Sequence, residues 1–226
     1  MINRLMTSLK KRWRVLRDPE FRRFRQLIRQ FNREQGRGTP TTFDGLTGDS
    51  VVFDLGGYEG EWADDMRRLY DCKVHVFEPH PLFAAALAER FSDDPNVTSH
   101  PYALGAAEGE LTLSDDADAS SAFSSSDTTV SGRIKPVQDV MAELGQPQVA
   151  AVKINIEGGE YDLLPALINT SLIRNFQTLV IQFHNYGPQD AEKRTKIREA
   201  LAATHTCKWN YDFVWERWDI LTKLKC

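Results

Sequence analysis

The stretch Val51-Val52-Phe53-Asp54-Leu55-Gly56-Gly57-Tyr58-Glu59-Gly60 decides the fold class of this chain. An apolar run of β-forming residues ends in an acid, and glycines then lead into residues 62–70, whose pattern is typical of a helix. A nucleotide-binding α/β domain begins in this way, with a strand, a tight turn and a helix. The glycines permit the sharp turn and let a ligand approach backbone N–H groups without interference from a Cβ atom.

A second acid follows at a spacing that defines the ligand further. Residues 74–77 form another apolar strand pattern, which ends at Glu78, 18 residues after Gly60. A carboxylate at this place can accept hydrogen bonds from both hydroxyls of a ribose. The spacing Asp-x-Gly-x-x-x-Gly differs from the dinucleotide pattern, and the acid before the glycines would repel a pyrophosphate. S-adenosylmethionine offers an amino group, a sulfonium and a ribose diol, so the pattern predicts a methyltransferase.

The composition is that of a folded protein with one main domain. The chain has 226 residues, of which 41% are hydrophobic and 27% charged, which fits one α/β domain with an appendage. Its cysteines, Cys72, Cys207 and Cys226, are odd in number and unclustered, which favours a reducing compartment and argues against a thiolate zinc site. No apolar run approaches the roughly 18 residues of a spanning helix. We therefore expect a cytoplasmic protein.

The charges are distributed unevenly. Residues 1–40 carry 12 Lys and Arg against 3 Asp and Glu, whereas the other 186 residues carry 16 against 29. Apolar residues recur at helical spacing between residues 2 and 16 and again between residues 21 and 31, and Asp18-Pro19 has the pattern of a helix start. The sequence therefore predicts a basic amphipathic helical arm over residues 1–38, followed by a cofactor-binding domain over residues 39–226.

Three interpretations of the arm remain open at this point. Its apolar stripes can cover the domain or a second subunit, with the arginines solvated. Residues 1–36 can instead lie on an anionic membrane surface, which would place the protein peripherally at the inner face of the membrane. Binding to nucleic acid has the least support, because no nucleic-acid-binding motif accompanies the charges.

Further along the chain, strand patterns alternate with helix patterns. Strands are expected at residues 97–104, 110–113, 149–157 and 176–183, and helices at 81–91, 136–144, 158–168 and 190–203. Residues 207–211 and 213–221 predict a terminal antiparallel hairpin, and residues 114–131 a loop or lid. The fold class expected is α/β, with a mostly parallel Rossmann-like sheet.

Five polar residues follow the predicted strands at the places where the strands end: Asp54, Glu78, Asn155, Glu157 and His184. Ligands of such sheets bind outside the carboxyl ends of the strands. We therefore expect these side chains to rim one binding crevice.

Taken together, these segments resemble the FkbM-type family of S-adenosylmethionine-dependent methyltransferases. The resemblance covers roughly residues 50–220 and is carried, in the order of the family, by residues 53–60, Phe77-Glu78-Pro79, Tyr102-Ala103-Leu104-Gly105, residues 153–160, Gln182-Phe183-His184-Asn185 and residues 213–218. It implies a seven-stranded class I methyltransferase fold and O-methylation of a hydroxyl on a sugar or a secondary metabolite. One departure is Asn155, where many relatives have aspartate.

By position and resemblance, the cofactor site can be assigned residue by residue. Asp54 and the turn formed by Gly56, Gly57, Tyr58 and Gly60 would hold the methionine end of S-adenosylmethionine. Glu78 would hold the ribose, and the backbone of Ala103 and Leu104 would meet the adenine.

The catalytic candidates are His184, Glu157 and Asn155. A sugar hydroxyl is a poor nucleophile at neutral pH, so a base at the strand ends would help. His184 is the first choice because an imidazole titrates near neutrality, and Glu157 is the alternative base or a group that orients His184. A divalent-metal site formed by these three residues is a further alternative, although we expect no metal because Asn155 carries no charge. Lys153 either faces the ligand or bridges to an acid.

The terminal hairpin adds one more open point, because Trp209, Trp215 and Trp218 either pack in the core or stack on a sugar ring. The leading function is an O-methyltransferase that acts on a glycan, a lipid-linked saccharide or a polyketide hydroxyl. The alternative is a non-catalytic cofactor-fold binding module anchored by the basic arm. A nucleic-acid methyltransferase has only the basic arm in its favour, and no base-flipping motif accompanies it.

Overall fold

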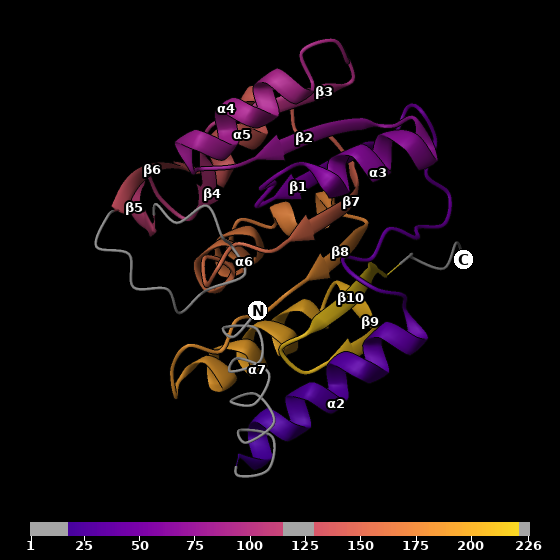
Figure 1. The fold of residues 1–226 in the computed structure, drawn as a ribbon, viewed down its shortest axis with the longest axis vertical. Coiled ribbons are helices and arrows are strands. Elements are labelled where there is room, and N and C mark those ends of the chain that lie inside the picture. Colours follow the sequence, from indigo (N-terminus) through magenta and orange to yellow (C-terminus); the bar gives the residue numbers. More distant parts are fainter. Residues whose placement is uncertain (1–17, 115–128, 222–226) are drawn as a thin grey trace, which may run out of the picture.

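A seven-stranded sheet forms the centre of the molecule, in a computed structural model that describes residues 18–114 and 129–221. The strand order is β3-β2-β1-β7-β8-β10-β9 (Figure 1). The strands are β1 (Val51–Leu55), β2 (Lys73–Phe77), β3 (Val97–His100), β7 (Val149–Ile154), β8 (Thr178–Ile181), β9 (His205–Tyr211) and β10 (Trp215–Ile220). The first five of these strands in the order are parallel, and β10 runs antiparallel to both β8 and β9. The expected class I sheet with a C-terminal antiparallel hairpin is confirmed.

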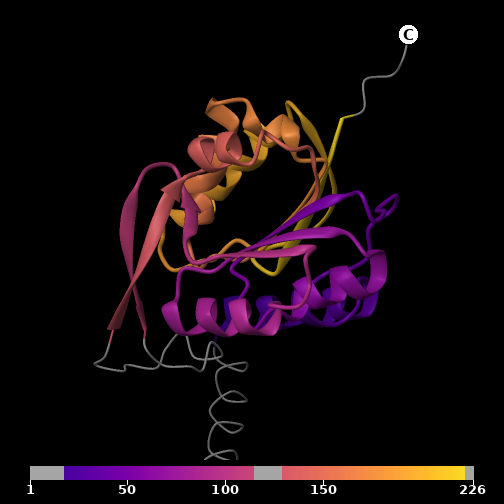
Figure 2. The same cartoon turned by 90° about the horizontal axis from the view of Figure 1, so that it is seen from above.

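Helices cover both faces of this sheet (Figure 2). One face carries α2 (Pro19–Glu34), α3 (Glu61–Tyr70) and α4 (Pro81–Arg90), and the other carries α5 (Val137–Glu143), α6 (Glu160–Asn169) and α7 (Asp190–Leu201), with a short 3-10 helix η1 (Leu172–Asn175). Successive side chains of β1 serve opposite faces, since Val52 belongs to the first core and Phe53 to the second. This arrangement explains why the central strands are apolar almost without alternation.

The register of the parallel strands decides where the binding edge lies. Leu55 at the end of β1 pairs with Phe77 of β2 and with Ile154 of β7, and Ile154 in turn pairs with Ile181 of β8. Four neighbouring strands therefore end level with one another. The segments that follow them, which begin near residues 56, 78, 155 and 182, meet at a single edge of the sheet.

The strand expected at residues 97–104 is wrong as a single element. Pro101 interrupts it, because proline has no N–H to give to a ladder. The first part is β3, which pairs with β2, and the second is β4 (Ala103–Gly105), which leaves the main sheet. In a separate three-stranded sheet, β4 is parallel to β6 (Thr129–Pro136), and β6 is antiparallel to β5 (Gly109–Ser114).

The loop expected at residues 114–131 is only partly described. Residues 129–131 belong to β6, so the expected loop is wrong at its C-terminal end. The signal for β6 is weak in the sequence, which contains a glycine and a proline, and the strand owes its existence to pairing with β5. The lid itself falls on residues 115–128, which lie outside the described part of the chain.

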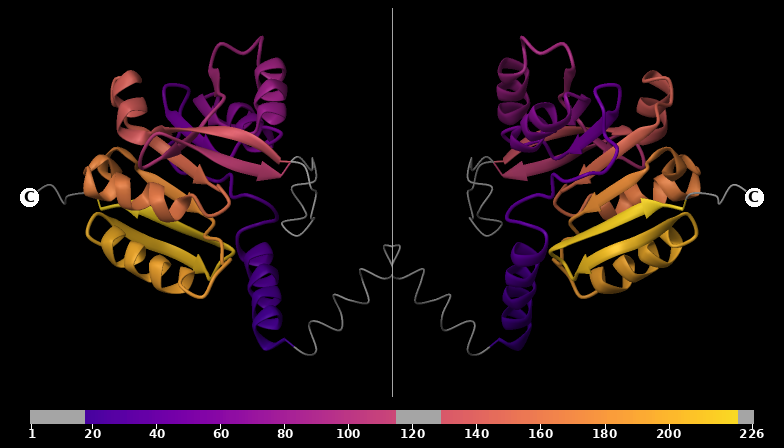
Figure 3. Two further views of the ribbon diagram at one scale, coloured as in Figure 1. Left: turned by 90° about the vertical axis from the view of Figure 1, so that its left-hand side faces the viewer. Right: turned by 90° about the vertical axis from the view of Figure 1, so that its right-hand side faces the viewer.

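Helix α2 is packed on the sheet beside the β9–β10 hairpin (Figure 3). Asp18 caps its start as expected, since its carboxylate accepts a hydrogen bond from Phe21 N at 2.9 Å. Phe31 is 2% exposed and packs edge-on against Tyr211, with ring centroids 5.4 Å apart. For this second stripe, the interpretation that the arm covers the domain is confirmed, whereas the first stripe lies outside the described residues. No described helix is both long and apolar enough to cross a bilayer.

The tryptophans of the hairpin also lie in the core. Trp215 and Trp218 are buried, and Trp209 packs at the side of Phe31. The expectation of core packing is confirmed for these residues, and the C-terminal hairpin is a structural edge of the sheet.

Phe31→Ala should lower the free energy of unfolding by about 3 kcal/mol, because a large buried ring is removed from a closed site. Urea denaturation followed by circular dichroism measures this change. Leu69→Ala, at a side chain 47% exposed on α3, is the matched control and should change the stability by about 0.5 kcal/mol or less. Equal effects of the two substitutions would mean that α2 is not part of the cooperative core.

A histidine pair on the neighbouring strands β2 and β3 makes the stability depend on pH. Burial, the neighbouring His75 and Lys135 lower the pKa of His100 from 6.5 to about 4. His100 Nε2 lies 3.0 Å from His75 Nδ1, and the His100 ring stacks on the ring of Phe77, with centroids 4.4 Å apart. The unfolded chain therefore binds a proton at pH 5 that the native imidazole does not bind.

We expect the stability of the native protein to fall as the pH is lowered from about 6.5 to about 4, by on the order of 2 kcal/mol from this group once its partial exposure is allowed for. His100→Gln should remove that part of the pH dependence. Urea titrations of both proteins between pH 4 and 7.5 test it, and parallel curves would contradict the assignment.

Candidate functional site

A cavity of about 950 Å³ lies at the edge where β1, β2 and β7 end. The segments that follow these strands line it together with β4 and β5 of the smaller sheet. In Figure 1 the arrowheads of β2, β7 and β8 point toward the side where β4, β5 and β6 lie. The volume is at the upper end of the range usual for ligand sites, which is enough for a nucleoside cofactor and part of an acceptor.

The turn after β1 brings bare backbone to this cavity. Gly56 has φ +80°, and its N–H donates to Phe77 O at 2.9 Å, which ties the turn to the end of β2. A Cβ at Gly56 would lie 2.0 Å from Asn155 O, and one at Gly57 would lie 2.2 Å from Val76 Cγ1. Only glycine fits at these two places, and the turn is fixed between the strands on either side of it.

Glu78 is held at the end of β2 with its carboxylate against the same turn. Its Oε2 accepts from Tyr58 N at 2.9 Å, and its Oε1 accepts from His80 N at 2.8 Å. Burial raises the pKa of Glu78, and these two backbone hydrogen bonds act in the opposite direction. A carboxylate with two backbone donors has a fixed orientation and keeps lone pairs for ligand hydroxyls.

Lys153 forms the floor between β1 and β7. Its Nζ donates to Asp54 Oδ1 at 2.8 Å and to Gly56 O at 2.5 Å, while its side chain also lines the cavity. Asp54 is 0% exposed, and burial raises the pKa of its carboxyl against the opposing charge of Lys153. Of the two roles expected for Lys153, the bridge to an acid is confirmed, and a role toward the ligand stays a prediction.

Asn155 and Glu157 continue from β7 into the wall of the cavity. Asn155 Oδ1 is buried and has no hydrogen-bond partner among the described residues, so it is available to a donor on a ligand. Glu157 has φ +52°, a left-handed conformation that costs a non-glycine residue about 1–2 kcal/mol. Its carboxylate accepts a hydrogen bond from the hydroxyl of Tyr186.

His184 stands behind Glu157 and outside the cavity wall. Its N–H and its Nδ1 lie 2.7 and 3.1 Å from Oε1 of the fully buried Glu160, and its Nε2 lies 3.8 Å from Glu157 Oε1. Burial lowers the pKa of His184, but the two carboxylates outweigh it, so the net shift is upward. Among the described residues, no three His, Cys, Asp or Glu side chains gather in the way a metal ion requires.

Most of the residues predicted from sequence come together at this edge. Those that line the cavity are Gly56, Gly57, Tyr58, Glu78, Ala103, Leu104, Asn155 and Glu157. Asp54 lies beneath the cavity under Lys153, Gly60 contacts α4, where a Cβ would lie 2.7 Å from Leu87, and His184 is behind Glu157.

Sequence reasoning missed two residues with clear roles at the site. Tyr186 contacts Glu157, and Glu160 joins the loops after β7 and β8, since its Oε2 accepts from Gly158 N at 2.8 Å. The sequence offered one indication of a role at the site for these two residues, namely that each lies close to the end of a predicted strand.

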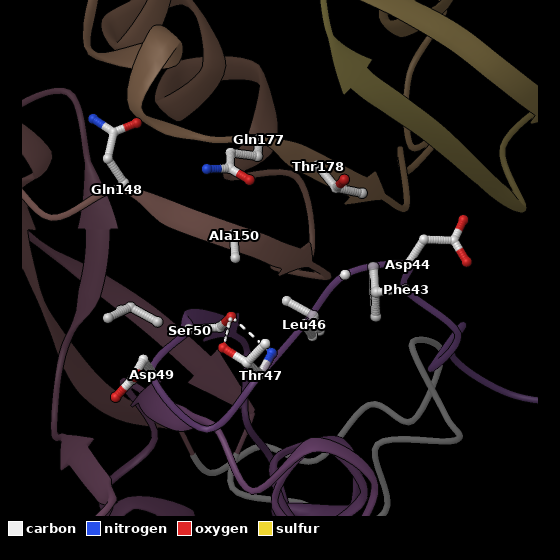
Figure 4. A pocket seen from close by; sticks show the side chains of 12 residues that line it. Phe43, Asp44, Leu46, Thr47, Asp49, Ser50, Gln148, Ala150, Gln177 and Thr178 are labelled. Carbon is white, nitrogen blue, oxygen red and sulfur yellow. Dashed lines mark hydrogen bonds between the residues drawn. The ribbon is translucent and has the colours of Figure 1, made fainter. Parts of the chain in front are cut away.

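A second depression, of about 380 Å³, lies at the opposite ends of the strands (Figure 4). Its lining mixes polar residues with the apolar Phe43, Leu46, Val51 and Ala150, and Thr47 N donates to Ser50 Oγ at 3.0 Å within it. It contains a glycine turn at Gly45, but its two acids, Asp44 and Asp49, are exposed rather than buried. Ligands of open α/β sheets bind outside the carboxyl ends of the strands, so the larger cavity is the candidate site.

The residues of the larger cavity fit S-adenosylmethionine. The Gly56–Gly57 turn brings backbone to the cavity at a place where a Cβ on either residue would collide with the neighbouring chain, Glu78 presents an oriented carboxylate suited to a ribose diol, and Asn155 Oδ1 offers an acceptor to an amino or hydroxyl group. Together with the strand order, these features define a class I methyltransferase.

The comparison with known protein families identifies the chain more closely. The methyltransferase FkbM domain matches residues 54–213, and the chain belongs to this family of S-adenosylmethionine-dependent methyltransferases. The resemblance expected from the sequence is confirmed. No curated protein matches the chain significantly.

Several solved structures of low sequence identity are similar in shape to this chain. A putative O-methyltransferase from Klebsiella pneumoniae has a TM-score of 0.47 and 11% identity, over 88% of this chain and 90% of that chain. Fibrillarin from Aeropyrum pernix, solved with natively bound S-adenosylmethionine, has a TM-score of 0.44 and 9% identity, over 78% and 67%. Precorrin-6y C5,15-methyltransferase from Geobacter metallireducens has a TM-score of 0.44 and 12% identity, over 79% of this chain and 83% of that chain.

Gly57→Ala should weaken binding of S-adenosylhomocysteine about tenfold or more, because the new methyl group must displace Val76 and with it the turn. Isothermal titration calorimetry measures the affinity, and urea denaturation shows the fraction of folded protein. Gly48→Ala is the control, since its Cβ would meet Asp71 O at an ordinary 3.5 Å. Unchanged affinity in folded Gly57→Ala protein would separate the turn from the cofactor.

Proposed function

We propose that this methyltransferase transfers the methyl group to a hydroxyl oxygen of a sugar, a glycan or a secondary metabolite. The observation that carries the proposal is a carboxylate, Glu157, which lines the cavity with Asn155, accepts a hydrogen bond from the Tyr186 hydroxyl and has His184 Nε2 3.8 Å from its Oε1. An acceptor hydroxyl needs a group that takes its proton, and Glu157 is placed for this at the end of the sheet.

The residues of the chain divide into a donor side and an acceptor side. We propose that the Gly56–Gly57 turn, Tyr58 and Lys153 surround the methionine end of the cofactor, that Glu78 binds the ribose, and that the segment at Ala103 and Leu104 meets the adenine. Bound S-adenosylmethionine supplies a methyl carbon activated by a sulfonium leaving group. The main work of the protein is then to align the acceptor oxygen with that carbon.

Glu157, rather than His184, is the group proposed to contact the acceptor hydroxyl. Glu157 lines the cavity, whereas His184 is engaged by Glu160 through its Nδ1 and reaches toward Glu157 with its Nε2. Glu157 would take the proton that the acceptor hydroxyl loses when it is methylated. The carboxylates of Glu160 and Glu157 raise the pKa of His184 against the effect of burial, because they favour its protonated form.

The proposed function is tested in two steps. Isothermal titration with S-adenosylhomocysteine should show one site per chain. Purified protein should then transfer tritium from methyl-labelled S-adenosylmethionine to hydroxyl oxygens in a panel of neutral oligosaccharides, methyl glycosides and hydroxylated macrolides. Label found only on nitrogen or carbon, or no label on any member of the panel, would contradict O-methylation.

Glu157→Gln should lower kcat about 10²- to 10⁴-fold, because the amide cannot accept the proton, while the affinity for S-adenosylhomocysteine changes less than about threefold. Steady-state kinetics and calorimetry on the same preparation measure both quantities. Glu192→Gln, an exposed change on α7, is the matched control and should leave kcat unchanged. A Glu157→Gln enzyme with normal kcat would remove Glu157 as the base.

A further inference from the structure

Tyr186 is a large side chain that the fold leaves open to solvent. It is 55% exposed, and it follows β8 in the loop that leads to α7. A single exposed aromatic residue is common on protein surfaces and by itself indicates nothing. The surroundings of this one are different, because its position and orientation are fixed on several sides.

The neighbours of Tyr186 fix the orientation of its ring. It stacks on the imidazole of His184, with centroids 5.4 Å apart and planes 15° apart, and its hydroxyl donates to Glu157. Its backbone N–H donates to Asp190 Oδ2 at 3.0 Å, which anchors the loop to the start of α7. His184 therefore covers part of the ring, and more than half of the side chain stays exposed to solvent. A rigid ring of this kind loses little entropy when a ligand stacks on it.

Tyr186 adjoins the cavity through two residues of its wall. Glu157 accepts its hydroxyl hydrogen, and a Cβ at Gly158 would lie 3.7 Å from the ring. A ligand resting on the exposed part of Tyr186 would thus have its edge next to the Glu157 carboxylate. This places the exposed ring beside the part of the cavity that Glu157 and Gly158 line.

The charges of the cavity restrict what can rest there. Among the described residues that line it, six are acidic, whereas Lys153 is the single lysine or arginine and is already paired with Asp54. The acidic residues are Glu59, Glu61, Glu78, Glu108, Glu157 and Asp162. Such a field repels sugar phosphates and uronic acids and accepts neutral polyols.

We propose that Tyr186 is the stacking platform of a subsite that binds a neutral pyranose ring, with Glu157 as the acceptor for its hydroxyls. The apolar C–H face of a pyranose suits the negative face of an aromatic ring, and its equatorial hydroxyls suit a carboxylate at the edge of that ring. This inference rests on the proposed O-methyl transfer and narrows its acceptor from hydroxyl compounds in general to neutral saccharides.

Saturation-transfer NMR on the full chain, saturated with S-adenosylhomocysteine, tests the subsite directly. The probes are the methyl glycosides of glucose, galactose, mannose, rhamnose and fucose, together with methyl glucuronide. At least one neutral glycoside should bind, with the strongest transfer at its ring C–H protons, and the glucuronide should bind about tenfold more weakly than the glucoside or not at all. Absence of binding by all neutral glycosides, or tighter binding of the glucuronide, would overturn the proposal.

Substitutions then assign the binding to the ring. Tyr186→Ala should lower the affinity for the glycoside about tenfold, as loss of a stacking side chain does elsewhere. Tyr186→Trp should keep the affinity within about threefold. Leu82→Ala, at another exposed side chain (56%) outside the cavity, is the matched control and should have no effect. Unchanged binding by Tyr186→Ala protein would overturn the assignment, and S-adenosylhomocysteine titration verifies that each variant is folded.

The two proposals fail in different ways. Glycoside binding through Tyr186 without methyl transfer to any hydroxyl would contradict O-methylation and leave the subsite in place. Methylation of a macrolide hydroxyl by a protein that binds none of the neutral glycosides would overturn the subsite and leave O-methylation in place.

Discussion

The buried contact between Lys153 and Asp54 is the interaction on which the binding edge depends. These residues face each other across the β1–β7 pairing, and the ammonium also donates to the carbonyl of Gly56. Removing one member of such a pair leaves a charge without compensation in the core, which typically costs about 3–5 kcal/mol. The pair therefore fixes the register of β1 against β7 and, through the Gly56 carbonyl, the course of the turn that approaches the cofactor.

The electrostatic character of the site follows from this pairing. Because Lys153 and Asp54 neutralise each other, the charge that a ligand meets comes from the acids around the cavity, among them Glu78 and Glu157. A sulfonium nucleoside is attracted by that field, whereas an anionic acceptor is repelled. Under the proposed function, the same surplus of carboxylates would select the donor for its positive charge and the acceptor for its lack of negative charge.

The sequence made the donor side predictable because that side is built from local rules. A turn that passes between two strands requires glycine, and the acid at the end of the second strand lies where a parallel sheet places it, so Gly56, Gly57 and Glu78 were identified from spacing alone. The order of strands and helices was predictable for the same reason. What could not be predicted depends on contacts between distant segments. The separation of β4 from β3 depends on pairing with β6, a strand that has almost no apolar pattern of its own.

The acceptor side illustrates the same limit at the level of single side chains. Whether His184 or Glu157 faces the cavity is decided by Glu160, which binds His184 from the start of α6, and no spacing in the sequence encodes that contact. Both Glu157 and Tyr186 lie in segments that follow strands, where the backbone is free to vary without disturbing the sheet. The cofactor turn has no such freedom, since a Cβ at Gly56 would meet the backbone of Asn155. In a protein built in this way, changes in the loops after β7 and β8 can alter the acceptor while the cofactor turn stays constant. Glu157, whose backbone is in a strained left-handed conformation, lies between the fixed turn and the variable loops.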